Sequence, residues 1–332
     1  MGFYTNKKVL VTGGTGLIGT PLVEMLVKEE AKVRIASLDD SSRAHPKAEF
    51  VRTDLTNFDN CLDVCGGMDY VFHLAGIKGS PKMTSERPAS IFDALILFNT
   101  NTLRAAKKAN VKSYLYTSTI GVYAPAEVFH EDDVWSTFPS KNDWSGGWSK
   151  RMGELQVEAY RKEFHWDNLS IVRPANVYGR YDNFDPANSM VVPSLIKRAV
   201  DGENPLVVWG DGSPVRDFIH AEDVARGMMF VMEQAYPHPV NLGSGKGYSI
   251  KELVDVIVKN LDRPVEVAWD ISKPSGDKKR LMDISRAREL GWKPCVSLED
   301  GVADVVRWYK ENKGDVNQDY RCFDITSQRT AK

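Results

Sequence analysis

The chain has 332 residues, of which 42% are hydrophobic and 27% are charged, and its formal net charge is -2 at pH 7. This length and apolar content are enough for a large core and predict a soluble protein of two lobes. A nearly balanced charge gives no general attraction to nucleic acid or to an anionic membrane, so we expect neither as a partner. Any anionic ligand must be held by local positive groups.

Neither a membrane span nor a secretion signal is expected. The longest apolar runs are the length of strands, and the N-terminal segment lacks a basic region followed by an apolar segment and a small-residue cleavage site. The cysteines Cys61, Cys65, Cys295 and Cys322 have neither the paired spacing of a zinc site nor the density of a disulfide scaffold. We therefore predict a cytoplasmic protein with structural thiols and no metal centre.

A glycine-rich turn separates the first expected strand from the first expected helix. Lys8 to Thr12 is a short β-branched run, the turn Gly13-Gly14-Thr15-Gly16-Leu17-Ile18-Gly19 follows, and Pro21 to Glu30 has amphipathic helical spacing. Glycines three apart permit a tight turn, let the backbone approach a pyrophosphate, and let the helix pack close to the strand. Such glycines are common in turns, but in this context they predict a dinucleotide site.

The end of the second strand bears on the choice of cofactor. An acid normally grips the adenosine ribose there, but the expected strand Lys32 to Ala36 is followed by Ser37, with Asp39 and Asp40 just beyond. Two carboxylates would repel a 2′-phosphate, whereas Arg43 could hold one. We therefore expect NAD, with NADP not excluded.

The next segments continue an alternation of strands and helices. Asp54 is placed to meet the adenine edge of a cofactor, or else to form an Asx turn or helix cap. Tyr70 to Gly76 is apolar, as expected for a strand buried on both faces, and His73 within it is expected to be a core histidine. With a helix expected at Ile91 to Ala109 and a strand at Ser113 to Thr117, these units predict an α/β fold with a doubly wound parallel (Rossmann) sheet.

Two lobes and a tail are expected. Residues 1–175 would form the dinucleotide-binding domain, and residues 206–245 would partly return to it. Residues 176–205 and 246–314 would form a smaller C-terminal α/β lobe that binds substrate. The segment 315–332 is polar and lacks periodicity, which predicts a loose tail.

Arginines in the second half of the chain offer a place for a diphosphate. Arg216 follows a turn at residues 210–214, and its planar guanidinium suits two phosphate oxygens. Arg198 and Arg280 could complete such a clamp. For each arginine the alternative is a solvated surface charge.

A lysine near the middle of the chain, Lys150, is expected on one face of a helix together with a glycine and a glutamate. Gly146, Lys150 and Glu154 are four residues apart, so they share one face of a helix. Trp144 and Trp148 stand beside them and could wall a site or pack against the other lobe. Alone, such a lysine is most often part of a solvated helix surface.

Five motifs occur in the order typical of extended short-chain dehydrogenase/reductases, the nucleotide-sugar epimerases, dehydratases and reductases. They are the Gly13 loop, HLAG at 73–76, YTSTIGVY at 116–123, Ser149-Lys150, and RPANVYG at 173–179. The resemblance covers residues 8–313. The second half is most similar to GDP-L-fucose synthases, in the runs 177–199, 207–227 and 278–292.

The resemblance implies a nicotinamide cofactor that exchanges a hydride with a sugar carbon, usually C4. In that family a tyrosine four residues before the lysine moves the hydroxyl proton, the lysine lowers the pKa of that tyrosine and holds the nicotinamide ribose, and a Ser or Thr hydroxyl orients the sugar oxygen. Lys150 and Thr119 match the last two roles. The substrate implied is a nucleoside-diphosphate sugar, most plausibly linked to GDP.

Three positions depart from the family pattern. Gly146 occupies the tyrosine position and cannot carry a proton, a loss that typically costs on the order of 100 to 10,000-fold in rate. Gly121 and Met190 occupy the positions of the acid/base pair for 3,5-epimerisation in fucose synthases, so we do not expect that activity. Ser145 is adjacent to Gly146 but lies five residues before Lys150, so on a regular helix it points away from the face of that lysine. Tyr123 and Tyr178 are other phenols that the fold could bring near Lys150.

The expected contacts are as follows. The cofactor would contact Gly13, Gly16, Leu17, Ile18, Gly19, Ser37, Asp39, Asp54, Leu55, Leu74, Ala75, Gly76, Thr117, Lys150 and Pro174. The substrate would contact Lys78, Trp148, Asn176, Val192, Arg198, Arg216 and Arg280.

Two functions are consistent with these residues. One is an NAD(P)-dependent epimerase, dehydratase or 4-keto reductase with atypical proton transfer. The other is a protein that binds the cofactor and a nucleotide sugar but has lost redox chemistry and serves as a sensor or assembly partner. By resemblance we also expect a homodimer, formed through the helix after the fourth strand and the Lys150 helix.

Overall fold

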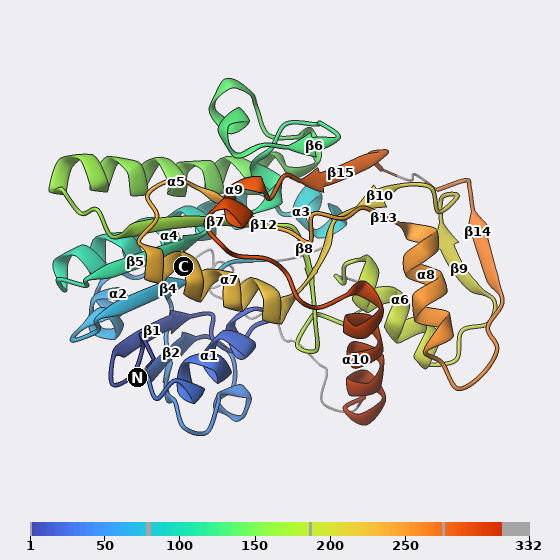
Figure 1. Cartoon of the computed structure of the whole chain (residues 1–332), viewed down its shortest axis with the longest axis horizontal. Coiled ribbons are helices and arrows are strands. Elements are labelled where there is room, and N and C mark those ends of the chain that lie inside the picture. The colour runs from blue at the N-terminus through green and yellow to red at the C-terminus, as the bar shows by residue number, and fades with distance from the viewer. Residues whose placement is uncertain (1, 78–80, 186–187, 274–275, 314–332) are drawn as a thin grey trace, which may run out of the picture.

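The computed structural model describes residues 2–77, 81–185, 188–273 and 276–313 (Figure 1). Its largest element is a seven-stranded sheet in which all neighbouring strands are parallel. In spatial order the strands are β3 (Glu49–Arg52), β2 (Lys32–Ser37), β1 (Lys8–Thr12), β4 (Tyr70–His73), β5 (Ser113–Thr117), β7 (Leu169–Pro174) and β12 (Val240–Leu242). β4, β5 and β7 are buried along their whole length, as parallel strands covered on both faces must be.

Helices cover both faces of this sheet. α1 (Gly19–Lys28) packs on α7 (Ala221–Gln234), whereas α4 (Pro88–Lys108) packs on both α2 (Phe58–Cys65) and α5 (Trp144–Phe164). Two clusters of buried apolar side chains result, one with residues of α1 and α7 and the other with residues of α2 and α4. The prediction of a doubly wound parallel sheet is confirmed.

Two helices begin earlier than their apolar periodicity indicates. α1 starts at Gly19, two residues before the expected Pro21, and α4 starts at Pro88, three residues before Ile91. Proline is tolerated in the first turn because its missing N–H has no partner there in any residue. In both α1 and α4 the proline therefore lies within the first turn of the helix.

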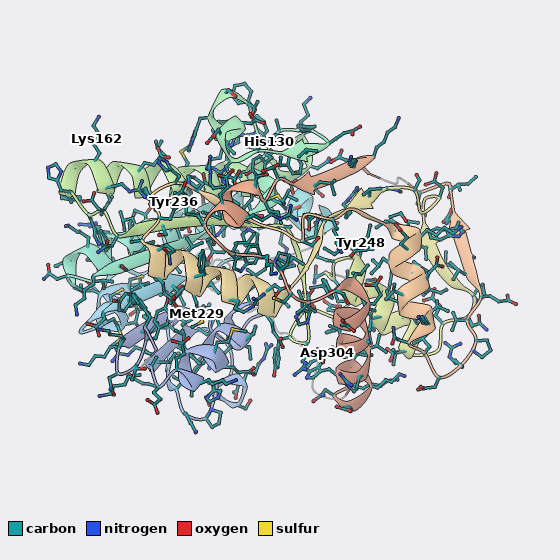
Figure 2. All side chains as sticks on the ribbon, viewed as in Figure 1. His130, Lys162, Met229, Tyr236, Tyr248 and Asp304 are labelled. Carbon is teal, nitrogen blue, oxygen red and sulfur yellow. The ribbon has the colours of Figure 1, made fainter. Side chains whose placement is uncertain are left out.

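A third apolar cluster forms the core of the second lobe. It holds side chains of α6 (Val191–Val200), α8 (Ile250–Lys259) and α10 (Leu298–Glu311). Figure 2 labels Asp304 on α10 and Tyr248 in this lobe, on the opposite side of the molecule from Lys162 at the end of α5. α8 begins with a capping box, in which Ser249 and Glu252 satisfy each other's backbone N–H groups.

The remaining elements are short. A four-stranded sheet has the order β13 (Tyr248–Ser249), β10 (Val215–Arg216), β15 (Lys279–Met282) and β6 (Val128–Phe129), while β11 (Phe218–His220) pairs with β8 (Asn176–Tyr178) and β14 (Val267–Asp270) with β9 (Leu206–Trp209). α3 (Pro81–Glu86), α9 (Ser285–Glu289) and 3-10 helices at Ser41–Arg43, Ile120–Val122, Glu131–Ser136 and Lys141–Asp143 complete the described chain. Within that described part, none of the helices is both long and apolar enough to cross a membrane.

A buried ion pair fixes α5 to the sheet. Arg173 of β7 donates to both carboxylate oxygens of Glu154, with Nε–Oε1 at 2.9 Å and NH2–Oε2 at 2.6 Å, and both side chains are fully buried. Ser118, just after β5, also donates to Glu154. Burial lowers the pKa of Arg173, but Glu154 and Tyr123 together more than offset this and keep the pKa above its ordinary value. The position of α5 along the sheet is therefore fixed by this ion pair as well as by the packing of apolar side chains.

Candidate functional site

A cleft of about 1020 Å³ opens beside the loop after β1, at the carboxyl ends of the strands. The strand order reverses between β1 and β4, and such a reversal leaves a crevice in an open α/β sheet. Most of the predicted site residues line this cleft: Gly13, Gly16, Leu17, Ile18, Gly19, Ser37, Asp39, Leu55, Leu74, Ala75, Gly76, Thr117, Thr119, Lys150, Pro174, Asn176, Val192 and Arg280. The fold thus brings together residues from both halves of the chain.

The glycine loop is as tight as the dinucleotide prediction requires. Gly13 has φ of +68°, and a Cβ placed on it would lie 3.1 Å from the backbone nitrogen of Ala75. A Cβ on Gly19 would lie 2.1 Å from the carbonyl oxygen of Gly13. Because the loop lines the cleft and leads directly into α1, its backbone can approach a pyrophosphate at the helix N-terminus. The loop therefore fits a dinucleotide cofactor.

The adenosine end of the cleft has a carboxylate in place. Asp39 accepts a hydrogen bond of 2.5 Å from Thr15 Oγ1, whose oxygen also hydrogen bonds with Ser37 Oγ at 2.8 Å. Arg43 NH1 lies 3.7 Å from Asp39 Oδ2 and also lines the cleft. This end can therefore accept from ribose hydroxyls, with one arginine beside the acid.

Asp54 does not line the cleft, although its neighbours Thr53 and Leu55 do. Its carboxylate accepts from the backbone N–H of Thr56 at 2.9 Å and from Thr56 Oγ1 at 2.8 Å. This is the Asx turn named above as the alternative to an adenine contact.

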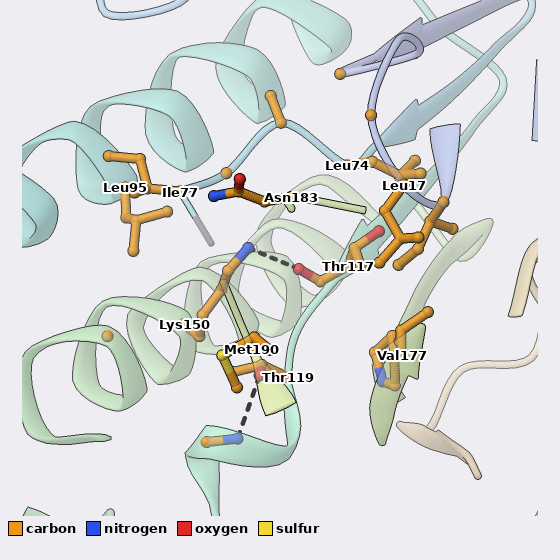
Figure 3. A pocket seen from close by; sticks show the side chains of 18 of the residues that line it. Leu17, Leu74, Ile77, Leu95, Thr117, Thr119, Lys150, Val177, Asn183 and Met190 are labelled. Atoms are coloured by element: carbon orange, nitrogen blue, oxygen red, sulfur yellow. Dashed lines mark hydrogen bonds between the residues drawn. The ribbon is translucent and has the colours of Figure 1, made fainter. Parts of the chain in front are cut away.

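Lys150 lies in the opposite part of the cleft. Its Nζ donates to the carbonyl of Thr117 at 2.8 Å (Figure 3). The same Nζ lies 5.1 Å from the centre of the Tyr116 ring. Burial lowers the pKa of Lys150 to about 8, against a smaller opposing effect of the Glu154 carboxylate. Thr119, also labelled in Figure 3, accepts from the backbone N–H of Gly121 at 3.2 Å. A lysine and a hydroxyl thus flank one part of the cleft, as predicted.

His73 is a core residue, as predicted. Its Nδ1 hydrogen bonds with Thr12 Oγ1 at 2.9 Å and its Nε2 with Asn99 Oδ1 at 3.2 Å. Burial and the nearby Lys150 charge lower its pKa to about 3, so the ring is neutral. Both ring nitrogens are used within the core.

The tyrosine position is open. Gly146 lines the cleft, and a Cβ placed on it would have no atom within 4 Å. The phenols considered as replacements lie elsewhere: Tyr123 donates to Asn241 Oδ1 at 2.6 Å and accepts from Arg173, and Tyr178 is buried beside Gly301 of α10. Neither lines the cleft. The fold therefore does not bring Tyr123 or Tyr178 to the cleft.

Several residues expected at the substrate have other partners. Arg198 pairs with Glu203 and donates to the carbonyl of Val207, and Arg216 donates to the carbonyls of Val215 and Asp277. Neither arginine lines the cleft, so the structure does not bring them into a clamp with Arg280.

Of the two tryptophans, it is Trp144 that lines the cleft. Trp148 packs against the rings of Phe138 and Trp144 and beneath the guanidinium of Arg151. Lys78 lies outside the described residues, as does the predicted tail.

One charged pair in the cleft was not predicted. Asp143, immediately before α5, lies with its Oδ2 3.2 Å from Arg280 NH2, and both residues line the cleft. The only feature of the sequence that could have pointed to Asp143 is its position three residues before Gly146, just before the Lys150 helix. Its partner, 137 residues further along the chain, could not be read from that spacing.

Known proteins of similar sequence and structure share this arrangement of the chain. The family model described as NAD dependent epimerase/dehydratase family matches residues 9–243. The chain is 31% identical over 317 residues to a putative GDP-L-fucose synthase 2 of Arabidopsis thaliana, with 92% of this chain and 93% of that protein covered.

Two solved structures are similar over nearly their whole length. An epimerase of Methanothermobacter thermautotrophicus has a TM-score of 0.83 at 27% identity, covering 94% of this chain and 95% of that one. A UDP-N-acetylglucosamine 4-epimerase of Methanobrevibacter ruminantium M1, in complex with UDP-N-acetylmuramic acid, has a TM-score of 0.82 at 26% identity, covering 93% and 99%.

Proposed function

Because the chain belongs to the NAD-dependent epimerase/dehydratase family, we propose that it is an NAD(P)-dependent enzyme that modifies a nucleoside-diphosphate sugar. The reaction would be an epimerisation, a dehydration or the reduction of a 4-keto sugar. The names of similar proteins mention GDP-, dTDP- and UDP-linked sugars, and we favour a GDP-sugar because the second half of the chain resembles GDP-L-fucose synthases.

The observation that carries this proposal is a single cleft with the glycine loop, Lys150, Thr119 and Arg280 on its walls. The loop would hold the pyrophosphate of the cofactor, and Lys150 would hold the nicotinamide ribose. A bound nicotinamide would supply the acceptor or donor of a hydride. Thr119 would orient the sugar oxygen through its hydroxyl, and residues 176–205 and 246–314 would form the lobe that binds the nucleotide sugar.

Asp39 supports NAD as the cofactor. Its carboxylate is positioned by Thr15 at the end of β2, where it would accept from the ribose hydroxyls and repel a 2′-phosphate. Arg43 beside it weakens that repulsion. NAD is therefore the proposed cofactor, and NADP is the cofactor against which its binding should be compared.

Fucose synthesis is not part of the proposal. Gly121 and Met190 both line the cleft, and neither side chain can exchange a proton at neutral pH. The same reasoning at Gly146 favours a second candidate, a protein that binds cofactor and nucleotide sugar without turning them over.

One experiment separates these candidates. Purified protein would be incubated with NAD or NADP and a panel of GDP-, UDP-, CDP- and dTDP-sugars and their 4-keto forms, and the sugars analysed by mass spectrometry and NMR. Product analysis is needed because an epimerase regenerates its cofactor and leaves the absorbance unchanged. Calorimetric binding without any product across the panel would reject the enzyme in favour of the binding protein. Substitution Lys150→Ala should abolish turnover or cofactor binding.

We propose a homodimer formed through α4 and α5. Leu97 of α4 is 39% exposed and Leu155 of α5 is 46% exposed, so each helix presents an apolar side chain that a partner could cover. Light scattering should show a dimer for the wild type and a monomer for Leu97→Glu/Leu155→Glu. A monomeric wild type would reject this interface.

A cytoplasmic location is proposed on the state of the thiols. Cys61 and Cys65 are free and buried, and Cys295 is free and exposed. Exposed free thiols persist in a reducing compartment. Fractionation of expressing cells would test this location, and recovery of the protein outside the cytoplasm would reject it.

A further inference from the structure

A carboxylate immediately before α5 lies beside Gly121 and Thr119, in the cleft that Gly146 also lines. A Cβ built on Gly121 would lie 3.4 Å from Thr119 Cγ2 and 3.5 Å from Asp143 Cγ. The threonine and the carboxyl group therefore flank one small volume. Gly121, Gly146, Thr119 and Asp143 all line the cleft, so that volume is open to a ligand.

Arg280 holds this carboxyl group from one side. Its NH2 lies 3.2 Å from Asp143 Oδ2, and its NH1 lies 3.9 Å from Asp277 Oδ2. The side chain of Arg280 is only 17% exposed, so it is a fixed partner rather than a mobile surface charge. Among the described residues Oδ1 of Asp143 has no hydrogen-bond partner, which leaves one oxygen for a ligand hydroxyl.

The other carboxylates that line the cleft are less suited to this position. Asp39 is at the adenosine end and bonded to Thr15, and Asp182 is only 3% exposed. Asp143 lies three residues before Gly146, at the N-cap of α5.

We propose that Asp143 takes the proton of the sugar hydroxyl as the carbon that bears this hydroxyl is oxidised. Asp143 would thus act in place of the side chain missing at Gly146. This inference rests on the proposed function. The C–H bond breaks and its electron pair leaves as hydride to the oxidised nicotinamide, the O–H proton passes to Asp143 Oδ1, and the carbon–oxygen double bond forms. In the reductive direction the neutral carboxyl group returns that proton to the oxygen as hydride returns to carbon.

Two neighbours support the transfer. The Thr119 oxygen accepts from the Gly121 N–H, so its own hydroxyl proton remains available to hold the sugar oxygen. Arg280 is a positioning residue, because it acts by fixing the orientation of the carboxyl group.

The test compares Asp143→Asn with wild type and with Asp132→Asn. The control removes another Asp–Arg pair, since Asp132 Oδ1 lies 2.8 Å from Arg286 NH2, and its side chain is 85% exposed and outside the cleft lining. Single-turnover rates would be measured with the panel sugar that the wild type converts, alongside calorimetry with NAD and that sugar and thermal unfolding of each variant. Asp143→Asn should lose on the order of 100-fold or more in rate. Its affinities should stay within about tenfold of wild type, which is the effect of one hydrogen bond.

A second variant distinguishes a proton acceptor from a structural residue. Tyrosine at position 146 meets no atom near its Cβ, so Asp143→Asn/Gly146→Tyr should regain rate while Asp143→Asn/Gly146→Phe should not. Equal rates for Asp143→Asn and wild type would overturn the assignment of Asp143 and leave the proposed function standing. Loss in Asp143→Asn that neither tyrosine nor phenylalanine restores, together with weakened binding, would also overturn it. Binding without turnover in the wild type would instead overturn the proposed function, and with it this step.

Discussion

The buried pair Glu154–Arg173 offers the sharpest test of how α5 is held on the sheet. We predict that Glu154→Gln is strongly destabilising. The change keeps the shape of the side chain but replaces one carboxylate oxygen by an NH2 group that faces the Arg173 guanidinium. The guanidinium would keep its bonds to Tyr123 Oη at 3.0 Å and to the carbonyl of Glu131 at 2.7 Å, but it would lack a counter-charge in a fully buried site.

The magnitude follows from burial. Removing one partner of a buried ion pair typically costs about 3–5 kcal/mol, because the other charge stays desolvated. For cooperative unfolding of a chain of 332 residues, an unfolding entropy of about 2.1 cal/mol/K per residue converts this loss into a fall in Tm of roughly 4–7 °C.

Calorimetric unfolding would measure this fall, with Glu49→Gln as the matched control. Glu49 pairs with Arg34 at 2.8 Å, but its side chain is 55% exposed, so its loss should cost under about 1 kcal/mol. The double variant Glu154→Gln/Arg173→Met leaves neither partner alone and should lose less than the sum of its two single variants. If Glu154→Gln unfolds at the same temperature as Glu49→Gln, the reasoning from desolvation is wrong.

Four further predictions concern the cleft. Gly19→Ala should weaken NAD binding by about tenfold or more in calorimetry, because the new Cβ would lie 2.1 Å from the Gly13 carbonyl and force the phosphate loop to move; unchanged affinity would contradict the loop geometry. Asp39→Ala should improve NADP binding relative to NAD by roughly tenfold, since it removes the charge that would face a 2′-phosphate; an unchanged ratio would show that Asp39 does not meet the ribose. NMR of ¹³C-dimethylated lysines should show one signal titrating near pH 8 that is absent from Lys150→Arg, and a set of signals that all titrate near 10.5 would refute its burial. Because folding lowers this pKa, the unfolded chain binds the proton more tightly, so the wild type should gain stability relative to Lys150→Met as the pH rises from 8 to 10.5.

Local patterns were sufficient to predict the sheet and the glycine loop that lines the cleft. A strand, a glycine turn and a helix are adjacent in the chain, and parallel strands buried on both faces are recognisable from continuous apolar runs. The resemblance to extended short-chain dehydrogenase/reductases is confirmed by the family model over residues 9–243. Lys150 and Thr119 come from different segments, yet both line the cleft because the strand order brings β5 beside the start of α5.

Residues whose function depends on distant partners were harder to predict. The sequence alone does not show whether an arginine already pairs with an acid of the same protein. Arg198 is such a case, because it pairs with Glu203, five residues away. The Asp54 carboxylate is likewise occupied by a neighbour, because it accepts a hydrogen bond from Thr56, two residues further along the chain. Asp143 gains its meaning from Arg280 of β15, which is 137 residues away in the sequence.

The glycines of α5 show that Gly146 is not explained by packing. A Cβ on Gly147 would lie 2.5 Å from the carbonyl of Gly121, and one on Gly153 would lie 2.2 Å from Tyr116 Oη, so both positions require glycine for close approach. A Cβ on Gly146 would meet nothing within 4 Å, and its backbone does not have a positive φ. Glycine inside a helix costs about 1 kcal/mol relative to alanine, so helix stability also disfavours it there. The space that Gly146 leaves is therefore part of the cleft, and the proposed reaction would need a proton acceptor on another residue of the same wall.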